Sequence, residues 1–173
     1  MPSEIKGSSN FDSDSAGKVL QVVSTLFSGQ GSITTDTTDK VTSPSITHTI
    51  TPVASGSNFI VKIRWFGEAS NNESTVAHIY RDASRLNEPN TNSWHGLSLN
   101  GLSGNYSDND STPCVMYVES LDKTGSTAGT AITYTLKYSA YSGTLWTNRT
   151  FFNSGAIHYE TGTSEIIIME IGA

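Results

Sequence analysis

The chain has 173 residues, which suits one domain, and its 16 acidic and 10 basic side chains give a net charge of −6. Only 35% of the residues are hydrophobic and 15% are charged, because 26 serines and 22 threonines fill much of the sequence. The absence of any run of lysine and arginine argues against nucleic acid and anionic membranes as partners. No stretch reaches the roughly 20 apolar residues of a membrane-spanning helix, and the N-terminus lacks the apolar core of a signal peptide.

The first 17 residues differ in composition from the rest of the chain. Residues 1–17 are rich in serine, aspartate and glycine, and Ile5 and Phe11 are isolated apolar positions among them. We expect this segment to be a polar arm that docks onto a partner protein through those two side chains. Residues 18–173 are predicted to form a single domain.

Short strand signals follow one another through that domain, separated by turn clusters of serine, asparagine and glycine. The predicted strands are 18–27, 45–50, 58–66, 75–82, 114–121, 131–141, 144–152, 156–160 and a final strand from Thr163. Their spacing is typical of a sandwich or barrel, and their one-sided alternation favours antiparallel pairing. The sequence therefore predicts an all-β fold, an antiparallel jelly-roll-like β-sandwich, with a long loop over 82–113.

Two of these strands alternate clearly enough to assign their faces. In 58–66 the apolar positions fall on one face and Lys62 and Arg64 on the other, and 131–141 alternates in the same way. The residues predicted to face the core are Phe59, Val61, Ile63, Trp65, Ile132, Tyr134, Leu136 and Tyr138.

The last strand, TSEIIIMEIGA, is unusual because it is apolar on both faces. An exposed edge strand of this kind would aggregate, so a central strand with two buried faces is expected. One face would enter the core with Glu170, whose carboxylate must then be paired or lie near the rim. The other face, Ile167, Met169 and Ile171, is predicted to form an oligomer interface.

Signals for catalysis and cofactors are missing from the sequence. It contains no nucleophile elbow, phosphate loop or metal-ligand spacing of histidines, so we expect neither enzyme activity nor a cofactor. His48 and His78 are interpreted as packed histidines on the apolar faces of their strands, and Cys114 as a small buried hydrophobe. The Asp108/Asp110 and Asp12/Asp14 pairs could contribute to a calcium site, although a solvated turn is the simpler interpretation.

Aromatic and polar residues outside the alternating core provide a candidate glycan-binding set. A sugar has an apolar side and a ring of hydroxyls, so an aromatic face beside the hydrogen-bonding groups of asparagine, aspartate or arginine suits it. The candidate residues are Trp94, His95, Tyr106, Tyr141, Trp146 and Asn148. The alternative is that these side chains cap the ends of the sandwich or pack between subunits.

The order of several strand motifs resembles a group of short virion proteins of tailed bacteriophages, related to the C-terminal domains of tail fibres. The resemblance spans about residues 16–173. The motifs that carry it are GKVLQVV (17–23), SITHTITPVASGSNFIVKIRW (45–65), IYRD (79–82), YTLKY (134–138) and SEIIIMEIGA (164–173).

This resemblance implies a homotrimeric, non-enzymatic structural protein on the virion surface, made in the host cytoplasm. It supports a host-attachment module that binds cell-surface glycans. The alternative is a capsid decoration or head-fibre protein, docked by its N-terminal arm onto a capsid or tail protein. Both interpretations require docking to another virion protein and neither transfers a catalytic residue to this chain.

Overall fold

The structure is a computed structural model, and it describes residues 17–70, 76–86, 99–101, 112–151 and 160–173. The regular structure of these residues consists of strands, and none of them lies in a helix that could cross a membrane. The strands are β1 (Val19–Phe27), β2 (Gly31–Thr34), β3 (Lys40–Val41), β4 (Thr47–Ile50), β5 (Asn58–Ala69), β6 (Val76–Arg81), β7 (Ser84–Arg85), β8 (Leu99–Gly101), β9 (Cys114–Asp122), β10 (Ile132–Ser139), β11 (Thr144–Thr147) and β12 (Ser164–Ile171).

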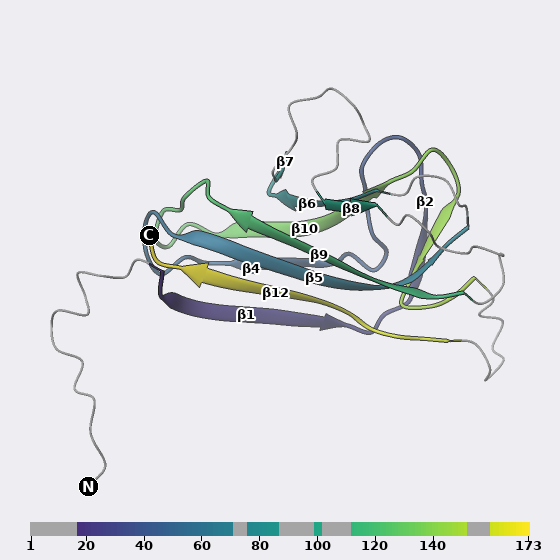
Figure 1. Cartoon of the computed structure of the whole chain (residues 1–173), viewed down its shortest axis with the longest axis horizontal. Helices are drawn as coiled ribbons and strands as arrows, with labels where there is room; N and C mark the ends of the chain where they lie inside the picture. Colours follow the sequence, from purple (N-terminus) through teal and green to yellow (C-terminus); the bar gives the residue numbers. More distant parts are fainter. Residues whose placement is uncertain (1–16, 71–75, 87–98, 102–111, 152–159) are drawn as a thin grey trace, which may run out of the picture.

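The strands form two antiparallel sheets. Sheet A has the order β1-β12-β5-β11-β2, and β9 pairs with the opposite edge of β5. Sheet B has the order β3-β10-β6-β7, with β4 also paired to β10 and β8 to β6. Figure 1 shows β1, β12, β5 and β9 running side by side in one layer. The amide of Gly17 donates to the carbonyl of Gly172 (2.8 Å), so the start of the described chain lies beside its C-terminus.

The hydrophobic core fills the space between the two sheets. Phe59 of sheet A lies 6.0 Å from Tyr134 of sheet B between ring centroids, and Trp65 lies 5.4 Å from Tyr138. The indole Nε1 of Trp65 donates to Thr147 Oγ1 (3.1 Å), which satisfies its polar group inside the core. All eight core positions predicted on 58–66 and 131–141 are buried, so this alternation is confirmed.

The predicted all-β, antiparallel sandwich is confirmed for the described residues. The short strands β2 and β3 were not predicted, because four and two residues carry too little periodic pattern. The predicted strand 144–152 is shorter than expected, since β11 ends at Thr147. Residues 156–159 lie outside the described part, as do most residues of the predicted loop 82–113, although β7 and β8 fall inside its limits.

The prediction that His78 shares the apolar face of its strand is wrong. Ala77 and Ile79 of β6 point into the core, so His78 between them points away from it. It is nevertheless fully buried, because Asp39 approaches it from the 35–40 segment, with 3.6 Å between His78 Nε2 and Asp39 Oδ1. His48 does lie on the inner side, where its Nδ1 is 2.6 Å from Thr25 Oγ1.

Candidate functional site

The two faces of β12 have different surroundings. Ile166, Ile168 and Glu170 are fully buried against the core, whereas Ile167 and Met169 are half-buried on the outer face of sheet A. β12 is a central strand, paired with β1 on one side and β5 on the other. The predicted orientation and central position of the last strand are therefore confirmed.

The buried carboxylate of Glu170 has a complete set of hydrogen-bond donors. Its oxygens accept from Gln21 Nε2 (2.6 Å), Ser57 Oγ (2.7 Å) and the amides of Val53 and Ala54 (3.0 and 3.1 Å). Burial alone would raise the pKa of Glu170, but the bonds from Val53, Gln21 and Ser57 outweigh it and lower the pKa below its ordinary value. The carboxylate thereby ties the 51–57 segment to β1 and β12.

The outer face of sheet A carries a continuous apolar row, which we call the apolar face. Val22 of β1 is opposite Met169 of β12, which is opposite Ile60 of β5, which in turn is opposite Leu121 of β9. Val22 is 55% exposed and Leu121 is 43% exposed, and the two central residues are half-buried. Ile171 lies on the same side of β12. Four strands from distant parts of the sequence thus form one hydrophobic surface.

Charged residues follow this row in a balanced arrangement. Lys62 of β5 pairs with Glu119 of β9 (3.4 Å between Nζ and Oε2), and in the next row Arg64 is opposite Glu165 of β12. The Nε of Arg64 is buried and has no hydrogen-bond partner among the described residues. A shallow pocket of about 320 Å³ lies between these residues and is bounded also by Tyr117. The apolar face therefore carries two cations and two anions beside its hydrophobic row.

The structure describes three of the six predicted glycan-binding residues. Tyr141 is 67% exposed, as a ligand-binding aromatic must be. Trp146 is only 6% exposed and stacks edge-on against Phe151 (4.8 Å between ring centroids). The Asn148 side chain is fully buried, where its Nδ2 donates to the carbonyls of Phe27 and Gly29 (both 2.8 Å).

Trp146 and Asn148 therefore do not present a surface to a sugar, and the prediction for these two residues is corrected. Both side chains pack within the subunit, Trp146 against Phe151 and Asn148 against the carbonyls of Phe27 and Gly29. Trp94, His95 and Tyr106 lie outside the described residues, as do the docking candidates Ile5 and Phe11. The acidic pairs Asp108/Asp110 and Asp12/Asp14 also lie outside them, and within the described part no group of histidine, cysteine and acidic residues could hold a metal ion.

Sequence reasoning missed a buried ionic cluster around Asp39. Its Oδ2 accepts from the hydroxyl of Tyr80 and from Arg85 Nη2 (2.7 Å), and its Oδ1 faces His78. Burial would raise the pKa of Asp39, but the bonds from Tyr80 and Arg85 hold that pKa below its ordinary value. These contacts attach the 35–40 segment to β6 and β7. Nothing in the sequence could have predicted this, because the residues are about 40 positions apart.

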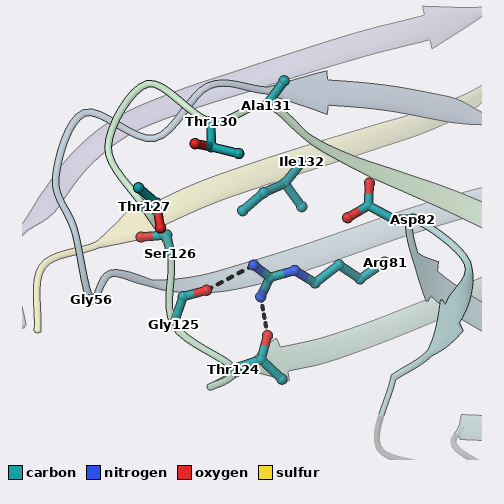
Figure 2. A pocket seen from close by; sticks show the side chains of 10 residues that line it. All are labelled: Gly56, Arg81, Asp82, Thr124, Gly125, Ser126, Thr127, Thr130, Ala131 and Ile132. Carbon is teal, nitrogen blue, oxygen red and sulfur yellow. Dashed lines mark hydrogen bonds between the residues drawn. The ribbon is translucent and has the colours of Figure 1, made fainter.

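A polar groove was also missed, at the end of the sandwich near the C-terminus. Figure 2 shows Arg81, at the end of β6, reaching across to the β9–β10 loop. Its guanidinium donates to the Thr124 hydroxyl and the Gly125 carbonyl (2.8 Å). Asp82 follows Arg81 and has a positive φ of 52°, a conformation that aspartate tolerates better than most residues. Serine and threonine hydroxyls line the other wall.

Comparisons with known proteins add little to this description. No protein-family model matches the chain, and no curated protein matches it. Among solved structures, the Eiger TNF from S. frugiperda is similar, with 11% sequence identity and a TM-score of 0.40 over 87% of this chain and 93% of that chain. A likeness of this degree carries no conclusion about this chain.

Proposed function

We propose that the protein is a non-enzymatic structural module of a bacteriophage virion surface that works as a homotrimer. The observation that carries this proposal is the apolar face, where a row of four hydrophobic side chains crosses β1, β12, β5 and β9. Exposed apolar patches rimmed by polar residues mark interaction sites. The resemblance of the strand motifs to those of tail-fibre domains supports the virion context, the jelly-roll-like arrangement and the trimer.

A second copy of the chain is the occupant that fits the apolar face best. Lys62 and Arg64 lie among Glu119 and Glu165, so rotated copies can match opposite charges at the edges of a hydrophobic centre. Completing the burial of each half-exposed aliphatic side chain stabilises the assembly by about 1 kcal/mol, and a closed trimer repeats that gain at every interface.

Sedimentation velocity on the purified protein tests the assembly. The wild type should sediment as a trimer, and Met169→Asp, at the centre of the row, should be a folded monomer because it places an unpaired charge in the interface. We expect association to weaken by about 100-fold or more. The matched control is Thr49→Asp, an exposed position on β4 of sheet B, which should remain trimeric. A wild-type protein that stays monomeric at high micromolar concentration would refute the proposal.

Within this proposal, we favour host attachment over capsid decoration. Trimer symmetry would present three identical ligand sites and so raise avidity for a surface glycan. Among the described residues of the predicted glycan-binding set, Tyr141 is the one whose side chain is exposed and can contact a ligand. Tyr141→Ala should reduce binding of the labelled trimer to host cells without changing its thermal stability, while Val53→Ala, also at an exposed position, should change neither. Wild-type protein that covers the capsid in many copies and does not bind cells would favour decoration instead.

A further inference from the structure

The polar groove beside Arg81 is large enough to hold a ligand. Two pockets, of about 400 and 590 Å³, share Arg81, Asp82 and Thr124 as lining residues, so they are neighbours along one polar surface, and we refer to them together as the groove. The first is walled by the β9–β10 loop and bounded by Gly56, and the second extends toward Leu86 at the end of β7. None of the residues that line the two pockets belongs to the row of Val22, Met169, Ile60 and Leu121.

Arg81 is held rigidly before any ligand arrives. Its Nη1 donates to the fully buried carboxylate of Asp122 (2.8 Å), which also accepts from Tyr134 Oη (2.6 Å) and the Thr124 amide (2.9 Å). Nη1 also donates to the Thr124 hydroxyl, and Nη2 donates to the Gly125 carbonyl. A guanidinium has five N–H groups, so two of them remain without an acceptor among the described residues. A side chain fixed in this way loses little entropy when it binds.

The remaining groups of the groove are suited to hydroxyls. Asp82 Oδ1 accepts from the Thr133 amide (3.0 Å), which fixes the carboxylate, and the residue is exposed. Thr127 and Thr130 are exposed and line the same wall, with Ala131 next to them (Figure 2). This arrangement supplies a strong acceptor, N–H donors and hydroxyls that act as both, beside a small apolar patch.

The charge balance of the pocket beside the β9–β10 loop disfavours an anionic ligand. There the positive charge of Arg81 is matched by Asp122 at 2.8 Å, and Asp82 adds a second carboxylate. The second pocket also contains Arg85, which is paired with Asp39 (2.7 Å), and the exposed Lys123. An anion would approach the Asp82 carboxylate with like charge, whereas a neutral polyol can donate to it.

We propose that this groove binds a neutral saccharide. Sugar hydroxyls donate to Asp82 Oδ2 and accept from the two remaining N–H groups of Arg81, while Thr127 and Thr130 hydrogen-bond to the ring substituents. The C–H side of the sugar packs on Ala131 and the bare backbone of Gly56. The biological meaning of this site rests on the proposed attachment role, whereas the binding itself requires neither a trimer nor a virion.

Amide NMR on the full chain tests the proposal with defined probes. Maltotriose, chitotriose and mannotriose serve as neutral probes, and trigalacturonate serves as the anionic probe. At millimolar concentration at least one neutral trisaccharide should shift the amides of Asp82, Gly125 and Ala131, while amides of β1 and β12 stay unchanged. Trigalacturonate should bind the groove more weakly.

Two matched variants locate the ligand. Asp82→Asn keeps an acceptor for the Thr133 amide and tolerates the positive φ, but it removes the charged acceptor, so affinity should fall by about tenfold or more. Asp36→Asn makes the same chemical change at an exposed position in another loop and should bind as the wild type does. The proposal is overturned if no neutral trisaccharide shifts the groove amides, if trigalacturonate alone does, or if Asp82→Asn binds unchanged. These outcomes are independent of the sedimentation result.

Discussion

The outer faces of the two sheets are built from different residues, although both belong to one sandwich. On sheet B, β4 and β10 face outward with threonines, and hydroxyls of facing residues bond to each other, as in Thr47 to Thr135 (2.9 Å) and Thr49 to Thr133 (2.8 Å). On sheet A, one complete row across β1, β12, β5 and β9 is aliphatic, and charged residues occupy part of the rows beside it.

We interpret this difference as one between an outer face of sheet B that suits contact with solvent and an outer face of sheet A that suits contact with a protein. Threonine suits a strand by its branched shape and gives the solvent a hydroxyl, so it keeps a sheet both stable and soluble. Valine, isoleucine and methionine give the same strand shape without a polar group. An otherwise threonine-rich protein that places aliphatic residues across four adjacent strands is expected to cover them, which is why we assign self-association to sheet A.

The sharpest comparison lies between two neighbouring residues of β12, Ile168 and Ile167. Ile168→Ala removes a fully buried side chain and should lower the free energy of unfolding by about 2–5 kcal/mol. Ile167→Ala, on the apolar face, should lower it by less than about 1 kcal/mol in the monomer but weaken assembly. Urea unfolding and sedimentation of both variants check this. Equal losses of stability would show that Ile167 packs within the subunit and would break the distinction.

A smaller effect on folding stability is expected for Glu170, which lies on the buried side of β12. Glu170→Gln places an amide against four hydrogen-bond donors and should cost about 1–3 kcal/mol of folding stability. Glu119→Gln is the control, because its pair with Lys62 is exposed and should contribute little.

The same residue predicts a pH dependence. The pKa of Glu170 is lower in the folded than in the unfolded chain, so its contribution to stability is present above about pH 4.5 and is lost as the pH falls through the folded-state pKa. Urea unfolding of the wild type and Glu170→Gln between pH 7 and pH 3 should show their difference shrinking toward acid. A constant difference would contradict this assignment.

The smallest effect is expected on the outer face of sheet B. Thr135→Val keeps the branched shape and removes the hydrogen bond between the hydroxyls of Thr135 and Thr47. The free energy of unfolding should therefore change by about 1 kcal/mol or less, and the proposed trimer should persist. The measurements are again urea unfolding and sedimentation velocity. Loss of the trimer in Thr135→Val would mean that sheet B, not sheet A, carries the interface.

The sequence predicted the parts of this structure that depend on local pattern. The period-two alternation of β5 and β10 identified the core residues, and the two-sided apolar pattern of β12 identified a central strand with an outward aliphatic face. It also indicated that Glu170 is either paired or near the rim, and the structure shows that it is paired. It failed for Trp146 and Asn148, because aromatic and amide residues near a turn can be buried or exposed with the same local sequence, and the contacts of Asn148 with Phe27 and Gly29 come from a segment about 120 residues away.

By itself, the sequence determined that this chain forms antiparallel strands and which side chains of its clearest strands are buried, because side-chain direction in a strand follows from position alone. The tertiary structure determined which residues come together at the surface, both in the apolar face and in the groove. The row of Val22, Met169, Ile60 and Leu121 is set by the pairing register of four strands. The groove at Arg81 is set by the return of the β9–β10 loop to the end of β6. Both are juxtapositions of distant segments, which a periodic pattern within one segment cannot encode.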